Sequence, residues 1–142
     1  MTIVIASDHG ALELKEAIKN HLKSRAVACT DLGTVTTDSV DYPDYADKVA
    51  NAILEGSAEL GILCCGTGIG ISIRANRYKG IRAALVYNDF TAEMAKAHNN
   101  ANVLCLGGRT TPPELAISLI DKWLDTDFEG GRHQGRLNKL DA

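Results

Sequence analysis

Leu60–Gly70 has the sequence LGILCCGTGIG, in which a short apolar run leads directly into a loop with three glycines. An apolar run of this length is typical of a buried strand. Glycines just after a strand permit positive φ angles and close backbone approach, so successive N–H groups and the next helix can bind an anion. The stretch therefore predicts a strand–loop–helix junction with an anion site, and the alternative is a tight turn without a ligand.

Similar apolar runs alternate with helical segments along the rest of the chain. The other β-rich runs are Thr2–Ala6, Ala26–Cys29, Ala83–Val86 and Asn102–Leu106. The segments between them carry apolar stripes of helical period, and Pro43, Pro112 and Pro113 lie where helices can begin. Buried strands that alternate with helices predict an α/β fold, a doubly wound parallel sheet of five strands with helices on both faces.

One helical segment, Ala11–Arg25, also carries a row of lysines. Lys15, Lys19 and Lys23 recur every four residues opposite the apolar stripe. A phosphate site could use such a row, but charged rows on amphipathic helices usually face solvent. We therefore expect these lysines to form a solvated outer face.

Length and charge limit the possible partners. The 142 residues are 45% hydrophobic, as in one soluble globular domain spanning 1–142. Fifteen Lys and Arg against 18 Asp and Glu give a net charge of −3, which offers no general attraction for nucleic acid or anionic lipid. No apolar stretch suits a signal peptide or a membrane span, and the four cysteines fit neither a disulfide framework nor a zinc site. We expect a cytoplasmic protein with reduced thiols.

The most reactive candidate side chain is Cys65. Adjacent residues of a strand point to opposite faces, so Cys64 is expected in the core while Cys65 opens the glycine loop. A thiolate near a helix N-terminus is stabilised and can act as a nucleophile or a general base. Cys29 and Cys105 lie inside apolar runs and are expected to be buried structural residues.

Further candidates follow the other strands, because ligands bind at the carboxyl ends of parallel strands. Asp8 and His9 follow the first strand, and Arg109 follows the fifth. His98 lies in the polar run Ala-His-Asn-Asn-Ala-Asn, which we expect beside the same edge. His21, on an amphipathic helix, is expected to be structural.

The last 13 residues, 130–142, form a basic tail in an acidic protein. It contains a single acidic residue, Asp141, and four basic ones, which are Arg132, His133, Arg136 and Lys139. If a helix follows the Gly-Gly pair, Arg132 and Arg136 share one face and can clamp a phosphate. An ordinary solubilising tail is the alternative.

Together these residues indicate a small phosphorylated substrate, a Cys/His acid–base pair and backbone donors for an oxyanion. The loop matches neither a P-loop nor a dinucleotide fingerprint, and no redox cofactor signature accompanies it. Such a reaction is proton transfer next to a carbonyl, as in an aldose–ketose isomerase. Hydrolysis by a Cys/His pair remains open from residue types alone.

Six motifs in order resemble ribose-5-phosphate isomerase type B, of the family that also holds galactose- and allose-6-phosphate isomerases. They are Ser7–Gly10, Asp41–Pro43, Cys65–Gly70, His98–Asn99, Gly107–Arg109 and Glu129–Arg136. The resemblance implies a Rossmann-like fold, no cofactor and no metal. It also implies a homodimer with active sites at the interface, and leaves open a tetramer and a substrate of five or six carbons.

The resemblance also assigns catalytic roles. Cys65 would be the base that moves a proton between C2 and C1, and His98 would open the sugar ring. Thr67 and the backbone N–H groups of the loop would hold the enediolate oxygen, through Gly66, Gly68, Ile69 and Gly70. Some relatives carry a glutamate base after the last glycine, but this chain has Ile71, which implies the cysteine version.

The remaining roles concern substrate binding. The resemblance implies that Asp8, Tyr42 and Asn99 contact the sugar. It further implies that four basic residues surround the phosphate or its neighbouring hydroxyls, namely His9, Arg109, Arg132 and Arg136. A sugar-phosphate-binding module without catalysis is the alternative from another functional class.

Overall fold

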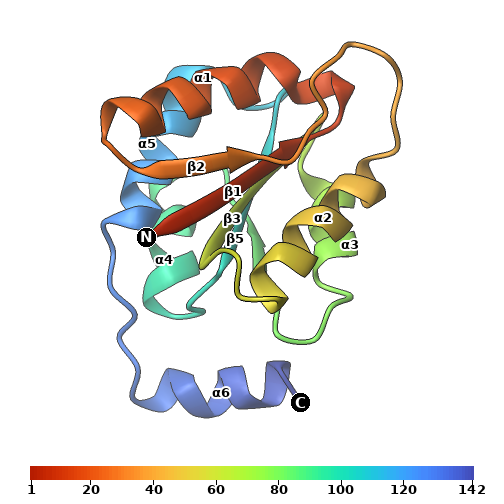
Figure 1. Cartoon of the computed structure of the whole chain (residues 1–142). Helices are drawn as coiled ribbons and strands as arrows, with labels where there is room; N and C mark the ends of the chain where they lie inside the picture. Colours follow the sequence, from red (N-terminus) through yellow and green to blue (C-terminus); the bar gives the residue numbers. More distant parts are fainter.

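The computed structural model describes all 142 residues and contains one five-stranded parallel sheet (Figure 1). The strands are β1 (Thr2–Ser7), β2 (Ala28–Asp31), β3 (Leu60–Cys65), β4 (Ala83–Leu85) and β5 (Val103–Gly107). Their order in the sheet is β2-β1-β3-β5-β4. The Rossmann-like doubly wound α/β fold is confirmed.

Helices cover both faces of this sheet. They are α1 (Leu12–Ser24), α2 (Tyr42–Leu54), α3 (Ile69–Ala75), α4 (Asp89–Ala97), α5 (Pro113–Leu124) and α6 (Arg132–Leu140), with a 3-10 turn, η1 (His9–Ala11). The helices α1, α4 and α5 pack on one face, and α2 and α3 on the other. Figure 1 shows α6 set apart from both layers, at the end of an extended segment that follows α5.

Alternation along the strands builds the two cores. Ile3 and Ile5 of β1 face α1, whereas Val4 and Ala6 face α2, and all four are almost completely buried. Each fully buried Ile or Val side chain contributes roughly 1.5–3 kcal/mol. Burial on both faces explains why the central strands read as continuous apolar runs.

The second strand begins two residues later than the apolar pattern predicts. Ala26 adopts a φ of +57° in the turn after α1, which delays β2 to Ala28. Because β2 is an edge strand, its residues alternate between exposed and half-buried positions. The predicted buried strand Ala26–Cys29 is therefore wrong in its bounds and its burial.

The prediction that the lysine row faces solvent is also wrong for its first residue, Lys15. Lys15 is completely buried, donates to the carbonyl oxygen of Thr34, and lies 2.8 Å from Asp31 Oδ1. Lys19, which is partly exposed, lies 2.9 Å from Asp31 Oδ2. Lys15 and Lys19 of α1 therefore turn toward Asp31 at the end of β2, and of the three lysines only Lys23 is exposed.

Replacement of Asp31 by Ala should lower the free energy of unfolding by about 3 kcal/mol, because it leaves the buried Lys15 ammonium without its carboxylate. The double variant Lys15→Met, Asp31→Ala should recover much of this loss. Urea unfolding followed by circular dichroism measures both. A single variant as stable as the wild type would contradict the pairing.

The same carboxylate should make stability depend on acid pH. Burial disfavours its charge, but hydrogen bonds from Lys15 and Lys19 outweigh burial and lower the pKa of Asp31. Its contribution is complete above the unfolded pKa of about 3.9 and is lost as the pH falls through the lower folded value. The stability difference between wild type and Asp31→Asn should therefore shrink as the pH drops from about 5 to about 2.

Candidate active site

One group of predicted residues meets at the carboxyl ends of the strands. Asp8 follows β1, Arg109 follows β5, and Cys65 ends β3 where the glycine loop begins. The amide of Asp8 donates to the carbonyl of Cys64, and the amide of Arg109 to that of Gly66. We call this group the carboxyl-edge cluster: Asp8, His9, Tyr42, Cys65–Gly70 and Arg109.

Backbone geometry holds the Cys65 thiol against the loop. The amide of Gly68 donates to Cys65 Sγ at 3.2 Å, and the amide of Ile69 donates to Thr67 Oγ1 at 3.2 Å. Gly68 has a φ of +79°, and a Cβ there would lie 2.9 Å from the carbonyl carbon of Leu106. The turn therefore requires glycine at this position.

Three other amides of the predicted donor set, those of Gly66, Thr67 and Gly70, have no acceptor within the chain. Gly66 and Thr67 are the two residues that follow Cys65, and Thr67 is exposed. Amides without an internal acceptor at the start of a helix are ready donors for an oxyanion. Of the five amides predicted to hold the enediolate oxygen, those of Gly68 and Ile69 already donate inside the loop, so three are left for a ligand.

The other three thiols differ from Cys65 in their surroundings. Cys64 points to the opposite face of β3 and is fully buried, as predicted. Burial raises the pKa of Cys64 and of Cys105 well above the ordinary range for a thiol, and that of Cys29 to about 11. These three thiols remain protonated at neutral pH and are poor bases.

Asp8 and His9 are oriented by backbone amides. Asp8 Oδ1 accepts the amide of Gly10 at 3.0 Å and caps η1. His9 Nδ1 accepts the amide of Val40 at 3.0 Å. A neutral His9 ring therefore carries its proton on Nε2, which can donate to a phosphate or hydroxyl.

Arg109 and Tyr42 lie on the loop itself. A Cβ on Gly66 would lie 3.2 Å from Arg109 Nη1, and one on Gly10 would lie 3.7 Å from Nη2, so the guanidinium spans two loops. A Cβ on Gly70 would lie 2.6 Å from Tyr42 Oη, so that ring rests on the backbone of Gly70. Both contacts depend on the absence of a side chain at these glycines.

The other predicted residues lie at the opposite end of the sheet. His98 ends α4, and the chain then enters β5 at Val103. A helix in a parallel α/β fold returns the chain to the amino ends of the strands. The expectation that His98 and Asn99 lie beside the loop edge is therefore wrong within one chain.

The tail joins this second group. The amide of Glu129 donates to the carbonyl of Ala97 at 3.0 Å, and Arg82, just before β4, lies 2.8 Å from Asp141. Residues 132–140 form the expected helix, on which Arg132 and Arg136 are exposed while His133 and Leu137 face inward. We call this group the amino-edge cluster: His98, Asn99, Glu129, Arg132, His133 and Arg136.

Within the amino-edge cluster, His98 and His133 are stacked. Their ring centroids lie 4.1 Å apart and the planes differ by 18°. Glu129 lies beside both, 3.8 Å from His98 Nε2 and 3.5 Å from His133 Nε2. Neither Glu129 nor His133 received a role from the sequence, although their four-residue spacing across the Gly-Gly turn was a signal.

These three residues are also the group that could hold a metal ion, since their donor atoms lie within 4.8 Å of one another. Nitrogen lone pairs lie in the plane of each imidazole, and nearly parallel stacked planes do not converge on one ion. Tetrahedral coordination by both rings would require one of them to turn. The arrangement favours stacking over chelation.

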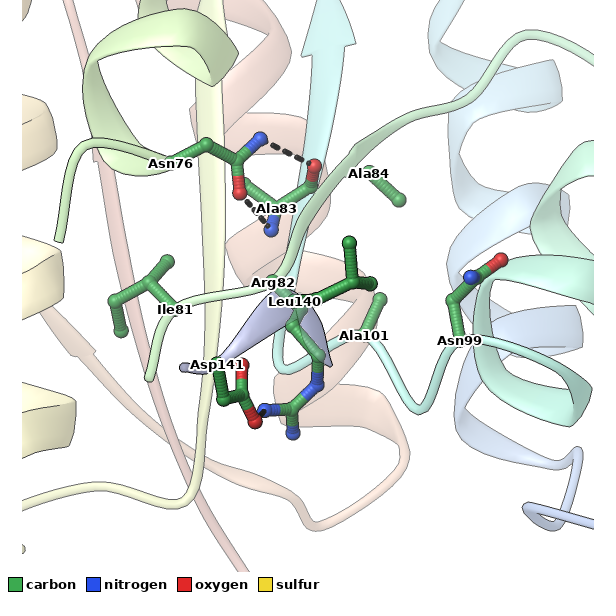
Figure 2. A pocket seen from close by; sticks show the side chains of 9 residues that line it. All are labelled: Asn76, Ile81, Arg82, Ala83, Ala84, Asn99, Ala101, Leu140 and Asp141. Carbon is green, nitrogen blue, oxygen red and sulfur yellow. Dashed lines mark hydrogen bonds and ion pairs between the residues drawn. The ribbon is translucent and has the colours of Figure 1, made fainter. Parts of the chain in front are cut away.

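A pocket of about 390 Å³ borders the amino-edge cluster between β4 and α6 (Figure 2). Asn99, Ala84 and Leu140 line it. Figure 2 shows the Asn76 carboxamide bonded to both the N–H and the C=O of Ala83, at 2.8 and 2.9 Å. This side chain occupies part of the open edge of β4, which blocks extension of the sheet there.

The two clusters do not meet within one chain. At ~3.3 Å per residue, β5 alone separates its two ends by roughly 15 Å. Arg25, Arg74 and Arg82 form ion pairs, whereas Arg109, Arg132 and Arg136 have no carboxylate partner. Each cluster therefore presents cations that are not neutralised within the chain.

No helix of the structure combines the length and apolar character needed to cross a bilayer.

The sequence and the fold match known proteins over nearly their whole length. A family model described as Ribose/Galactose Isomerase matches residues 3–140. Ribose-5-phosphate isomerase B of Escherichia coli is 44% identical over 140 residues, covering 99% of this chain and 94% of that protein.

Solved structures agree with this match. A ribose 5-phosphate isomerase structure from Thermotoga maritima is 54% identical with a TM-score of 0.97, covering 99% of this chain and 97% of that one. Ribose-5-phosphate isomerase B from Mycoplasma genitalium, with bound ribulose-5-phosphate, is 46% identical with a TM-score of 0.95, covering 99% and 93%. The chain therefore belongs to the ribose/galactose isomerase family and is an isomerase, similar in sequence and fold to the type B ribose-5-phosphate isomerases.

Proposed function

We propose that the protein interconverts ribose 5-phosphate and ribulose 5-phosphate without a cofactor. The observation that carries this proposal is the Cys65 thiol beside two loop amides, those of Gly66 and Thr67, that have no acceptor in the chain. A base next to oxyanion donors suits proton abstraction beside a carbonyl. The Mycoplasma relative with bound ribulose-5-phosphate supports this substrate. Family membership disfavours the hydrolase and the binding module.

In the proposed proton transfer, the Cys65 thiolate takes the proton from C2 of the open-chain aldose. The C2–H electrons form a C1=C2 bond, and the negative charge on O1 is held by the amides of Gly66 and Thr67. The thiol then returns the proton to C1 while the O2 proton passes to O1 with help from the Thr67 hydroxyl. A ketone at C2 and an alcohol at C1 result, and the thiolate is restored.

The proposed ring opening comes before this transfer. The C1–O4 bond breaks, its electron pair goes to O4, and O4 takes a proton from His98. The hydroxyl on C1 loses its proton to solvent and becomes the aldehyde, and His98 is protonated again from solvent. Asp8 and Tyr42 of one cluster and Asn99 of the other orient the sugar hydroxyls.

This chemistry needs both clusters, so we propose that the active site forms between two copies of the chain. In a two-fold symmetric dimer, the amino edge of one sheet can lie against the carboxyl edge of the other. His98 of the partner subunit would then face Cys65, and Arg132 and Arg136 of the partner subunit would join His9 and Arg109 around the phosphate.

Apolar surface around β4 supports this dimer. Seven large apolar side chains are more than half exposed, and besides Met1 and Val35 they are Ile69, Ile73, Tyr87, Phe90 and Leu140. Ile69 and Ile73 belong to α3, which packs against β4. Tyr87 lies two residues after the end of β4, and Leu140 lines a pocket with Ala84. Exposed apolar side chains gathered at one edge are typical of a protein interface.

The variant Cys65→Ala should lower kcat by about 10²–10⁴-fold, because it removes the base. Turnover of ribose 5-phosphate in deuterated water measures both isomerisation and label incorporation, and allose 6-phosphate in parallel measures the preferred chain length. Cys29→Ala, far from the loop on β2, is the matched control. Turnover close to that of the wild type would rule out Cys65 as the base.

The variant Arg136→Ala should mainly raise KM, by the equivalent of roughly 1.5–3 kcal/mol, because a phosphate that does not react loses a charge-assisted hydrogen bond. Steady-state kinetics with ribose 5-phosphate measure the change. Lys139→Ala, on the same helix, should leave KM nearly unchanged. An unchanged KM in Arg136→Ala would contradict the phosphate clamp.

Mixed dimers test whether the site is shared between subunits. Cys65→Ala and His98→Asn should each be inactive on ribose 5-phosphate alone. After unfolding and refolding together, random pairing makes half of the dimers mixed, and each mixed dimer has one intact site of two. The mixture should regain about a quarter of wild-type activity. If each site were built within one chain, no activity would return.

A further inference from the structure

The amino-edge cluster contains a second imidazole that the proposed reaction does not use. The His133 side chain is only 7% exposed, whereas His98, against which it stacks, is 38% exposed. The more exposed ring is the one that can reach a substrate. The buried ring lies against its neighbour and can act through it.

Backbone contacts hold the stacked pair in one arrangement. At the end of α4, the amide of His98 donates to the carbonyl oxygen of Met94. The amide of Glu129 donates to the carbonyl oxygen of Ala97, the residue before His98. The amide of His133 donates to Gly130 in the turn that begins α6. The rings therefore approach each other from two separate elements, with the Glu129 backbone tied to the end of α4.

The Glu129 carboxylate lies beside both rings. One of its oxygens is 3.8 Å from His98 Nε2, and the other is 3.5 Å from His133 Nε2. The stacking contact and this carboxylate therefore restrict how the His98 ring can turn.

We propose that His133 and Glu129 are positioning residues for His98: His133 fixes the plane of the His98 ring, and Glu129, beside Nε2, fixes how the ring is turned within that plane. This inference rests on the proposed function of the site. A catalytic acid that is misplaced by a small distance loses much of its effect, which is why a stacking partner matters.

The two directions of the reaction distinguish this role from a structural one. Ribose 5-phosphate closes into a furanose and needs ring opening. Ribulose 5-phosphate carries its carbonyl at C2 and its phosphate on O5, so it cannot close into a five-membered ring. A residue that acts through His98 should therefore affect turnover of the aldose and leave turnover of the ketose nearly unchanged.

The experiment compares kcat and KM for both sugars in His133→Ala, His133→Phe and Glu129→Gln, with Gln134→Ala as control. Gln134 is exposed on the same helix, and its side chain is hydrogen-bonded only to Asn138. With ribose 5-phosphate, kcat of His133→Ala should fall about 10- to 100-fold with KM unchanged. His133→Phe, which can still stack, should recover part of the loss, and Gln134→Ala should match the wild type.

With ribulose 5-phosphate, all variants should keep kcat within about twofold of the wild type, since no ring opens. Equal losses with both sugars, a change confined to KM, or no loss with the aldose would each overturn the inference. If His133→Ala does not fold, Glu129→Gln decides, because its side chain is 56% exposed and its backbone bond is retained. A wild type that does not convert ribose 5-phosphate would overturn the proposed function instead.

Discussion

All five strands run in the same direction, and the arrangement of the site depends on that constraint. Parallel strands bring every residue that follows a strand to one edge, and every residue that follows a helix to the other. Cys65 and His98 therefore lie at opposite ends of β5, about 15 Å or more apart. A reaction that needs both residues calls for a second copy of the chain, and the exposed apolar side chains around β4 offer a surface for it.

The carboxyl-edge cluster owes its geometry to glycines. Gly68 takes a positive φ so that its amide reaches the Cys65 sulfur, and Gly66 and Gly70 leave room for the Arg109 guanidinium and the Tyr42 ring. The amino-edge cluster uses a different device, in which the two glycines after Glu129 turn the chain back into α6 and bring His133 onto His98. One edge thus supplies a thiol and backbone amides without an internal acceptor, and the other supplies imidazoles and cations.

Much of the fold could be predicted from local patterns. The five strands, the helix after the Gly-Gly pair and the opposite faces of Cys64 and Cys65 all follow from periods of two and 3.6 residues. Two predictions, the start of the second strand and the exposure of Lys15, are wrong for a shared reason. The start of β2 and the burial of Lys15 depend on the turn at Ala26 and on Asp31, which lies 16 residues further along the chain. A helical period cannot reveal an ion pair with another element.

The sequence by itself determined the α/β class, the loop at Cys65 and the identity of the cationic side chains, because each depends on neighbours within a few residues. Only the tertiary structure decided that His98 lies at the far edge of the sheet and that His133 and Glu129 lie against it. Those relations join three parts of the chain, namely α4, the segment between α5 and α6, and α6 itself. Their contacts arise from packing between residues that are distant in sequence.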